Sequence, residues 1–404
     1  MYIQHTTMRS SSPLFLHNFR IHLPKNLGTH EQNVQWLAAA HAQAEATLRK
    51  DEPDFDQSAF RRQIERYIRR FGPSPEAVGG RRSDIDEFLD EEFENKKLFP
   101  LHQKPEGAGL GLRMDVFAEM ADNAVKSLYT TDEAAPNEIL HVTCTGYASP
   151  SAPQKLVEQR QWNEQTHITH VYHMGCYASL PAIRIAAGYL ASSNSPDVRA
   201  DLVHTEICTL HLNPTRHDAE QLVVQSLFAD GYVRYSLTRS PLVELARGEL
   251  VESVETAGFI LLGFLERLIP DSLPDIGWIP GDFGMRMTLS RHVPDKIAAV
   301  LESFLIALAA ECGLAREDLN NAVYAVHPGG PRILDKVSEW LHLEPSQLQA
   351  SRKVLLERGN MSSATLPHIW AGILEDTTVP SNTLIVSLAF GPGLTIYGSL
   401  MRRV

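Results

Sequence analysis

The chain has 404 residues, of which 43% are hydrophobic and 21% charged, a composition typical of a globular protein. The formal net charge of -12 argues against a general nucleic-acid-binding role, which requires a basic surface. The four cysteines (Cys144, Cys176, Cys208, Cys312) are far apart and lack C-x-x-C spacing, so neither a disulfide framework nor a zinc site is expected. No secretory signal and no bilayer-spanning run is recognised. We expect a cytoplasmic protein that binds neither nucleic acid nor membrane.

The first 128 residues predict one strand and three helices. Residues 14–23 alternate as a strand, and Thr29 with Gln32 forms a capping box before a helix that ends near residue 48. Helices are also expected at residues 57–70 and 113–128. A basic cluster on the second helix and just after it is interpreted either as a solvated face or as a landing site for the phosphate of coenzyme A or of an acyl carrier's pantetheine arm. Its members are Arg61, Arg62, Arg66, Arg69, Arg70, Arg81 and Arg82.

From residue 138 onward, strands and helices alternate, which predicts a layered α/β fold. The second part of the chain repeats the theme of the first, so we predict two similar halves, residues 1–245 and 246–404. The expected strands cover residues 138–144, 168–174, 200–206, 232–237, 255–262, 284–289, 322–327, 383–390 and 394–401. The expected helices after residue 138 include residues 177–190, 218–227, 294–312, 331–341, 345–357 and 362–374.

The segment from Val171 to Leu190 places a cysteine between a strand and a helix. The strand-like run turns at Gly175, and the helix that follows has almost no polar residue, as expected of a buried helix. Cys176 would then lie deep in the protein, in the first turn of that helix. Unpaired backbone N–H groups and the positive end of the helix dipole would favour its thiolate. The alternative is a structural core cysteine.

Two further polar residues stand at ends of apolar elements. His327 ends the run Val323-Tyr-Ala-Val-His, and Asn360 lies just before a predicted helix. Sites in α/β sheets form at the carboxyl ends of strands. Together the three residues would suit Claisen chemistry, because the thiolate attacks an acyl thioester while histidine and asparagine donate to a thioester carbonyl and stabilise an enolate. Papain-like proteases also use Cys-His-Asn, but their C-G-[SA]-C-[WY] context is missing here.

Five sequence blocks resemble the type III polyketide synthases, the chalcone synthase-like branch of the thiolase superfamily. They occur in the family's order between about residue 110 and the C-terminus, and five ordered blocks are more specific than any single motif. The blocks are Met174-Gly-Cys-Tyr-Ala, Leu227-Phe-Ala-Asp-Gly, Val326-His-Pro-Gly-Gly-Pro-Arg-Ile-Leu, Gly359-Asn-Met-Ser-Ser-Ala and Phe390-Gly-Pro-Gly-Leu-Thr.

The resemblance implies a five-layered αβαβα thiolase fold of two pseudo-symmetric halves, and a homodimer. It implies Cys176 as the acyl acceptor, with His327 and Asn360 holding the thioester carbonyl. No tightly bound cofactor or metal is implied, and the substrates would be thioesters of coenzyme A or of a carrier's phosphopantetheine. Implied substrate-binding residues, each of which could instead be ordinary core packing, are the gatekeeper Phe228, then Met287, Cys144, Tyr147, His211 and Ser362.

The likeness also suggests a branch. The segments beginning at Val142, His204 and Val223 are similar to bacterial stand-alone ketosynthases that join two β-ketoacyl chains into an α-pyrone, as in the corallopyronin and myxopyronin antibiotic pathways. Two alternatives stay open: another thiolase-fold condensing enzyme of the ketoacyl synthase III type, against which the Phe390-Gly-Pro-Gly block argues, and a non-catalytic acyl-binding partner.

His167, His170 and His173 recur every third residue, but a strand would point them to alternating faces, so no metal site is expected.

Overall fold

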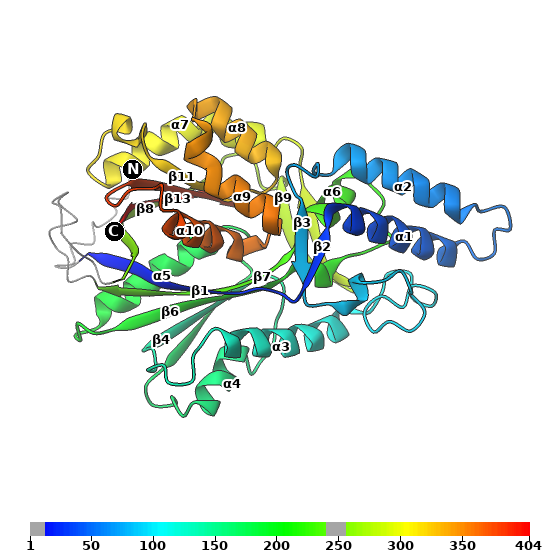
Figure 1. The fold of residues 1–404 in the computed structure, drawn as a ribbon, viewed down its shortest axis with the longest axis horizontal. Coiled ribbons are helices and arrows are strands. Elements are labelled where there is room, and N and C mark those ends of the chain that lie inside the picture. Colours follow the sequence, from blue (N-terminus) through cyan, green and yellow to red (C-terminus); the bar gives the residue numbers. More distant parts are fainter. Residues whose placement is uncertain (1–12, 240–255) are drawn as a thin grey trace.

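The computed structural model describes residues 13–239 and 256–404, so the predicted boundary between residues 245 and 246 lies outside the described residues (Figure 1). The strands are β1 (Leu14–His22), β2 (Asn26–Thr29), β3 (Gly80–Ser83), β4 (Glu138–Thr143), β5 (His167–Tyr172), β6 (Arg199–Ile207), β7 (Asp230–Arg239), β8 (Gly258–Leu268), β9 (Ile276–Gly281), β10 (Gly284–Leu289), β11 (Val323–Val326), β12 (Leu384–Gly391) and β13 (Thr395–Arg403). The helices are α1 (His30–Leu48), α2 (Gln57–Phe71), α3 (Leu110–Ser127), α4 (Ala152–Gln159), α5 (Ser179–Ser192), α6 (Ala219–Leu227), α7 (Val293–Glu311), α8 (Pro331–Leu341), α9 (Gln349–Arg358) and α10 (Thr365–Glu375).

One mixed sheet runs through the molecule, in the order β11-β12-β13-β8-β1-β7-β6-β4-β5. Its two ends repeat one pattern: β7 is antiparallel to β6, which continues parallel through β4, and β13 is antiparallel to β12, which continues parallel to β11. Strand β1 lies at the seam, antiparallel to β7 on one side and to β8 on the other. The sheet thus repeats one strand pattern at its two ends, and the division into residues 1–245 and 246–404 stays a prediction.

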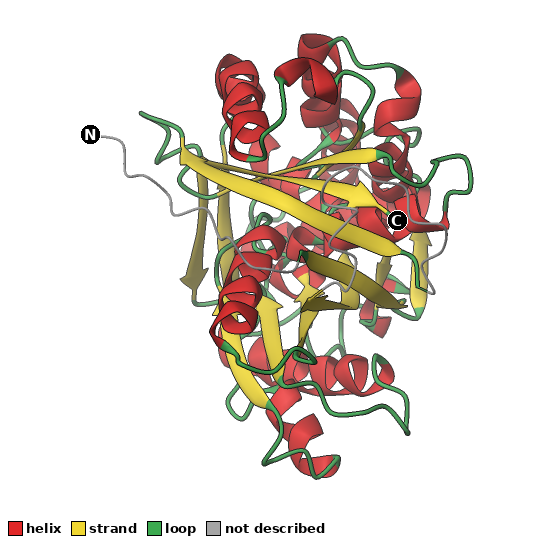
Figure 2. Cartoon of the chain, turned by 90° about the vertical axis from the view of Figure 1, so that its left-hand side faces the viewer, coloured by secondary structure: helices red, strands yellow, loops and turns green. Residues whose placement is uncertain are grey.

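Helices divide the sheet into layers. In Figure 1, α3 and α4 cover the outer face of the half formed by β4 and β6, whereas α7 and α8 cover the outer face of the half formed by β8 and β13. Helices α5 and α10 contact strands of both halves and lie between them, and Figure 2 shows the two groups of strands separated by helices. This is the αβαβα arrangement that the resemblance implies. The inner helices are mostly buried, because residues on all their faces are apolar.

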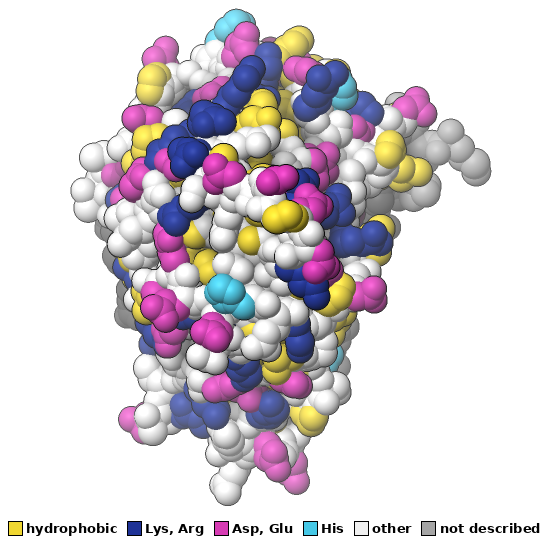
Figure 3. Space-filling view, turned by 90° about the vertical axis from the view of Figure 1, so that its right-hand side faces the viewer, with side chains coloured by type: hydrophobic (Ala, Val, Ile, Leu, Met, Phe, Trp, Pro, Cys, Tyr) yellow, Lys and Arg dark blue, Asp and Glu magenta, His cyan; other side chains and the backbone are white. Residues whose placement is uncertain are grey.

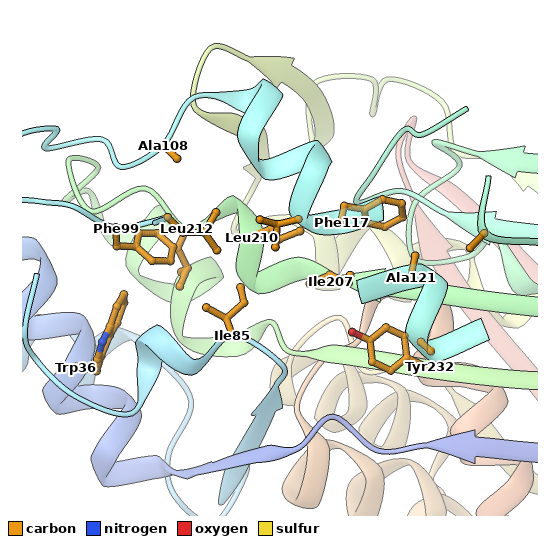
Figure 4. Close-up of a cluster of buried hydrophobic side chains, with 14 of the residues drawn as sticks. Trp36, Ile85, Phe99, Ala108, Phe117, Ala121, Ile207, Leu210, Leu212 and Tyr232 are labelled. Carbon is orange, nitrogen blue, oxygen red and sulfur yellow. The ribbon is translucent and has the colours of Figure 1, made fainter. Parts of the chain in front are cut away.

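A hydrophobic cluster anchors the end of the molecule that carries α1 and α2. Aromatic rings of Trp36, Phe99 and Phe117 meet aliphatic side chains from the end of β6 and the turn after it, as Figure 4 shows. Trp36 also donates its indole N–H to the carbonyl of Glu87 at 3.0 Å. The cluster fixes α1 and α2 beside the end of β6, and Arg70 and Phe71 at the end of α2 line the cavity described next.

Most predicted elements are confirmed, and two differences from the predictions are of interest. Helix α3 begins at Leu110, earlier than expected, because the Leu110 N–H donates to the carbonyl of Asp282 at 2.7 Å, a contact remote in sequence. Strand β9 was not expected, since Gly277, Pro280 and Gly281 disfavour strands. It forms because it pairs antiparallel with β10 as a separate two-stranded sheet.

Candidate active site

Cys176 lies in the turn between β5 and α5. The prediction that it occupies the first turn of the helix is wrong, because α5 begins three residues later, at Ser179. The turn is tight: the Ala178 N–H donates to the Gly175 carbonyl at 3.1 Å, and Gly175 has φ of +80°, a conformation that favours glycine. A Cβ at Gly175 would also lie 2.7 Å from Cδ of Pro392. The cysteine turn is therefore seated on the loop that follows β12.

Gly391 provides a direct test of this seating. A Cβ at position 391 would overlap the ring of Tyr177, the residue next to Cys176. We expect Gly391→Ala to displace the turn and to lower the rate of Cys176 alkylation by iodoacetamide by about tenfold or more, because small misplacements cost up to about 100-fold in rate. Gly372→Ala is the control, since no atom lies within 4 Å of a Cβ built there. An unchanged alkylation rate in Gly391→Ala would contradict this account.

His327 follows β11 at the carboxyl end of the strand. Its backbone N–H donates to the carbonyl of Leu388 at 2.8 Å, which continues the parallel ladder between β11 and β12 by one residue. The imidazole is 1% exposed, and among the described residues neither ring nitrogen has a hydrogen-bond partner. Burial lowers the pKa of His327 to about 3, so the ring is neutral at pH 7 and can accept a proton.

Asn360 is oriented by its neighbours. Its carboxamide oxygen accepts from the backbone N–H of Ser362 at 2.9 Å, which directs the amide nitrogen the other way. That nitrogen is buried and has no partner within the described parts of the chain. Backbone bonds fix the segment, since the Asn360 N–H donates to the Leu227 carbonyl at 3.1 Å and its carbonyl accepts from Ala229 at 2.9 Å. The side chain thus presents a free donor from a rigid support.

One cavity of about 680 Å³ brings the three predicted residues together. Its walls come from both halves of the fold and from the β9–β10 hairpin, and positively charged side chains lie at its rim. Wall residues from the first half include Cys144, Cys176, Cys208 and Phe228, those from the second half include Trp278, Met287, His327, Asn360 and Ser362, and the basic residues are Arg70, Arg291 and Arg332. A thiol, an imidazole and a carboxamide donor therefore face a shared space.

Burial at Cys176 favours the thiol over the thiolate that the sequence led us to expect. Part of its surface is open to the cavity, but burial raises its pKa to about 12, and a hydrogen bond to the Ser362 hydroxyl at 3.8 Å offsets only part of this effect. The expected helix dipole is weak at this position because α5 starts beyond the cysteine. The imidazole of His327 lines the same cavity as this thiol.

A polar network extends behind the cysteine. The Ser362 hydroxyl lies 2.9 Å from Sγ of Cys144, and Cys144 donates its backbone N–H to the carboxylate of Glu206 at 3.1 Å. Glu206 is fully buried and also accepts from Thr145 at 2.8 Å and from Ser363. Burial raises the pKa of Glu206. In the sequence, the only sign that Glu206 lies beside the site is its place near the end of the apolar strand β6.

The remaining predicted binding residues fall in different places. Phe228, Met287, Cys144 and Ser362 line the cavity of Cys176. His211 lines a neighbouring cavity of about 570 Å³ that shares Cys208, Phe228, Trp278 and Met287 as walls. Tyr147 lines neither of these two cavities: the residue is 39% exposed and its hydroxyl bonds to His173. Substrate contacts of all these residues stay predictions.

Trp278 was missed because it lies on the unexpected strand β9. Its indole N–H donates to the Cys144 carbonyl at 2.6 Å, and its ring meets that of His211 edge-on at 5.5 Å between centroids. The His211 ring is fixed in turn, accepting from the Met285 N–H at 3.1 Å and lying 2.8 Å from the Thr145 carbonyl. The partition between the two cavities is therefore held in place by hydrogen bonds.

The arginine cluster divides between surface and interior. Arg61 pairs with Glu91 at 2.8 Å, and Arg69 pairs with Glu31 at 2.7 Å, so these two form part of a solvated face. Figure 3 shows basic and acidic side chains interspersed over the end of the molecule that carries α1 and α2. Arg81 is buried and Arg82 donates to the Pro24 carbonyl at 2.9 Å, which removes both from a phosphate site. Arg70 alone of the cluster reaches the cavity rim.

Within residues 13–239 and 256–404, no helix is long and apolar enough to cross a membrane. No group of three or more His, Cys, Asp or Glu side chains in them could hold a metal ion. His167 and His170 lie on β5, and His173 follows the strand.

Comparison with known sequences connects this geometry to a family. Residues 264–404 match the C-terminal domain of chalcone and stilbene synthases. Type III polyketide synthase C of Arabidopsis thaliana is 29% identical over 270 residues, covering 66% of this chain and 67% of that protein. Type III polyketide synthase B of the same plant is 27% identical over 300 residues, covering 72% and 74%. Probable polyketide synthase 1 of Dictyostelium discoideum is 29% identical over 276 residues, 68% of this chain, but this chain spans only 8% of that protein.

Solved structures share the fold over nearly the whole chain. The C-terminal type III polyketide synthase domain of Steely1 from Dictyostelium has a TM-score of 0.78 and 21% identity, covering 97% of this chain and 99% of that one. PKS-I of the brown alga Ectocarpus siliculosus also has a TM-score of 0.78, with 20% identity and 100% coverage of both chains. Tetrahydroxynaphthalene synthase of Streptomyces coelicolor A3(2) has a TM-score of 0.72 with 23% identity, covering 96% and 99%. The C-terminal part of this chain thus matches the chalcone and stilbene synthase domain, and the chain is similar in sequence to type III polyketide synthases and shares their thiolase fold.

Proposed function

We propose that this protein forms carbon–carbon bonds by Claisen condensation of acyl thioesters, with Cys176, His327 and Asn360 as its catalytic residues. The observation that carries the proposal is the convergence of a thiol, a neutral imidazole and an oriented carboxamide donor on one cavity. Buried polar atoms without partners are uncommon in folded proteins and are expected where a ligand completes the hydrogen bonds. A thioester carbonyl oxygen accepts two such bonds.

The first step loads the enzyme. His327 accepts the proton of the Cys176 thiol as the sulfur attacks the carbonyl carbon of an acyl thioester. The carbon–sulfur bond to the carrier breaks, the carrier's thiolate leaves and takes up a proton, and an acyl group remains on Sγ. The cavity admits a chain because its walls near Phe228, Trp278 and Met287 are apolar.

The second step makes the new bond. The carbonyl oxygen of a malonyl or β-ketoacyl thioester would accept from the N–H of His327 and from the amide nitrogen of Asn360. Loss of carbon dioxide from a malonyl unit, or transfer of a proton from a β-ketoacyl unit to water, gives an enolate whose carbon attacks the acyl group on Cys176. The carbon–sulfur bond to Cys176 breaks, and the expelled thiolate takes up a proton from water. Both N–H donors stabilise the negative charge that develops on the thioester oxygen as the enolate forms, and this lowers the barrier to enolate formation.

The finer assignment concerns substrate and product. We propose cyclisation of the condensed chain to an α-pyrone or a related ring within secondary-metabolite biosynthesis, which the branch-level sequence likeness supports. Arg70, Arg291 and Arg332 at the rim suit the phosphates of coenzyme A or of a carrier protein's phosphopantetheine arm. A homodimer and a cytoplasmic location are proposed from the same likeness.

Acyl labelling tests the central assignment. The native enzyme, mixed with a panel of acyl thioesters, is expected to gain one acyl mass on the peptide that carries Cys176, and Cys176→Ala is expected to gain none. Cys312→Ala is the control, because Cys312 lies beside Gly263 of β8 and lines neither cavity. An adduct that persists in Cys176→Ala would defeat the assignment. A native enzyme that dimerises but never accepts an acyl group would favour the non-catalytic alternative.

A further inference from the structure

Arg81, on the short strand β3, is a buried cation that contacts backbone rather than carboxylates. Arg81 is only 7% exposed. One of its guanidinium nitrogens donates to the carbonyls of Gln225 at 2.8 Å and Phe228 at 2.6 Å. No ion pair joins it to an acidic side chain among the described residues. Burial lowers the pKa of Arg81 to about 10, and Asp230 offsets part of this, so the group is charged at neutral pH.

The two carbonyls belong to the C-terminal end of α6, where unsatisfied acceptors and the negative end of the helix dipole gather. A cation there is favourable, but burying it costs several kcal/mol before such contacts compensate. An exposed lysine or ordered water would satisfy the same carbonyls. Arg81 instead enters the protein interior, where it touches the segments that carry two cavity residues.

Those segments meet beside the guanidinium. Residues Leu227 and Ala229, on either side of Phe228, exchange backbone hydrogen bonds with Asn360 at 3.1 and 2.9 Å. Gly359, with φ of +72°, passes so close that a Cβ would lie 3.0 Å from the Leu227 carbonyl and 3.1 Å from Cγ of Arg81. Arg81 therefore clamps the end of α6 against the chain that holds Asn360.

We infer that Arg81 is a positioning residue that sets the placement of the Asn360 amide donor and of Phe228 in the cavity. This inference rests on the proposed function. Arg81 bonds to the carbonyls of Gln225 and Phe228, and the clamped segment reaches the Cys176 thiol only through the 3.8 Å contact of the Ser362 hydroxyl. Loss of Arg81 is therefore expected to impair decarboxylation of a malonyl thioester far more than acylation of Cys176.

The test measures both half-reactions in the full-length protein. Arg81→Met is expected to lower decarboxylation of malonyl coenzyme A by between about 10-fold and 100-fold, with Cys176 acylation within about twofold of native. Arg81→Lys keeps one charged donor and is expected to recover part of the loss. Gly359→Ala presses on the same junction and is expected to show the same selective loss. The matched control is Arg403→Met, since Arg403 also donates to two carbonyls at a helix end, those of Leu374 and Asp376, but at the far end of α10.

The outcomes separate this inference from the proposed function. Native-like decarboxylation in Arg81→Met, or equal loss of both half-reactions in the folded Arg81→Lys variant, overturns the role of Arg81. If Arg81→Met does not fold, as judged by thermal unfolding, Arg81→Lys and Gly359→Ala decide the question alone. Decarboxylation that is unaffected in Asn360→Ala, or acylation that survives in Cys176→Ala, instead overturns the proposed function itself.

Discussion

Replacing His327 with alanine is expected to lower acylation of Cys176 at pH 7 by about 10²- to 10⁴-fold, the contribution typical of a positioned general base. The reason is the raised pKa of the thiol, about 12, which leaves almost no thiolate in neutral solution without a local proton acceptor. The imidazole is neutral at this pH because burial lowers its own pKa to about 3. Acyl transfer would be followed by mass spectrometry of the intact protein after rapid quenching.

The pH dependence of acylation in His327→Ala provides a second test of the general-base role. A thiol with a raised pKa gains thiolate as pH rises, so residual acylation in His327→Ala is expected to grow about tenfold per pH unit between pH 7 and 9. The native enzyme should show a flatter profile over this range, since its base stays unprotonated throughout. The exposed His342→Ala variant is the control. A native-like rate in His327→Ala would show that another group deprotonates the sulfur.

Replacing Asn360 with aspartate is expected to reduce decarboxylation of a malonyl thioester by about 10²- to 10³-fold, the loss seen when one donor to a developing oxyanion is removed. Aspartate keeps the size and the oxygen that accepts from the Ser362 N–H, but it has no amide nitrogen to donate. Loss of carbon dioxide would be measured as conversion of the malonyl to the acetyl thioester.

Asn360→Ala serves as the companion variant. It removes the donor without adding a carboxylate, so a similar loss in both variants assigns the effect to the missing N–H rather than to a new charge. Acylation of Cys176 should stay within about threefold of native in Asn360→Ala, because the loading step is assigned to Cys176 and His327. If loading falls as far as decarboxylation, the carboxamide serves both steps and the division of roles proposed for the three residues is wrong.

The three central residues stand out in the sequence because each interrupts or ends an apolar element. Cys176 follows a strand, His327 follows another, and Asn360 precedes a buried helix. The structure places all three on one cavity, and their catalytic roles stay predictions. The protonation state of Cys176 was not predictable in this way, because it depends on where α5 begins and on how deeply the turn is buried. Both are consequences of tertiary packing.

Other features lay beyond sequence patterns for the same reason. Trp278 lies on β9, whose glycines and proline do not predict a strand from the sequence. The strand forms only by pairing with β10. Arg81 was grouped with surface arginines, since nothing in a run of basic residues shows which side chain turns inward. Long-range pairing and the direction of long, flexible side chains are set by contacts distant in sequence.

The seam strand β1 has a consequence for how the polypeptide matures. It is synthesised before its hydrogen-bonding partners, β7 and β8, which begin more than 200 positions later. The edges of β1 stay unpaired until those residues have been made, and proteins dominated by such distant pairings assemble slowly and aggregate readily in the meantime. Low growth temperature or co-produced chaperones should therefore raise the recovered yield of active enzyme. Substitutions within the cavity should not change this effect.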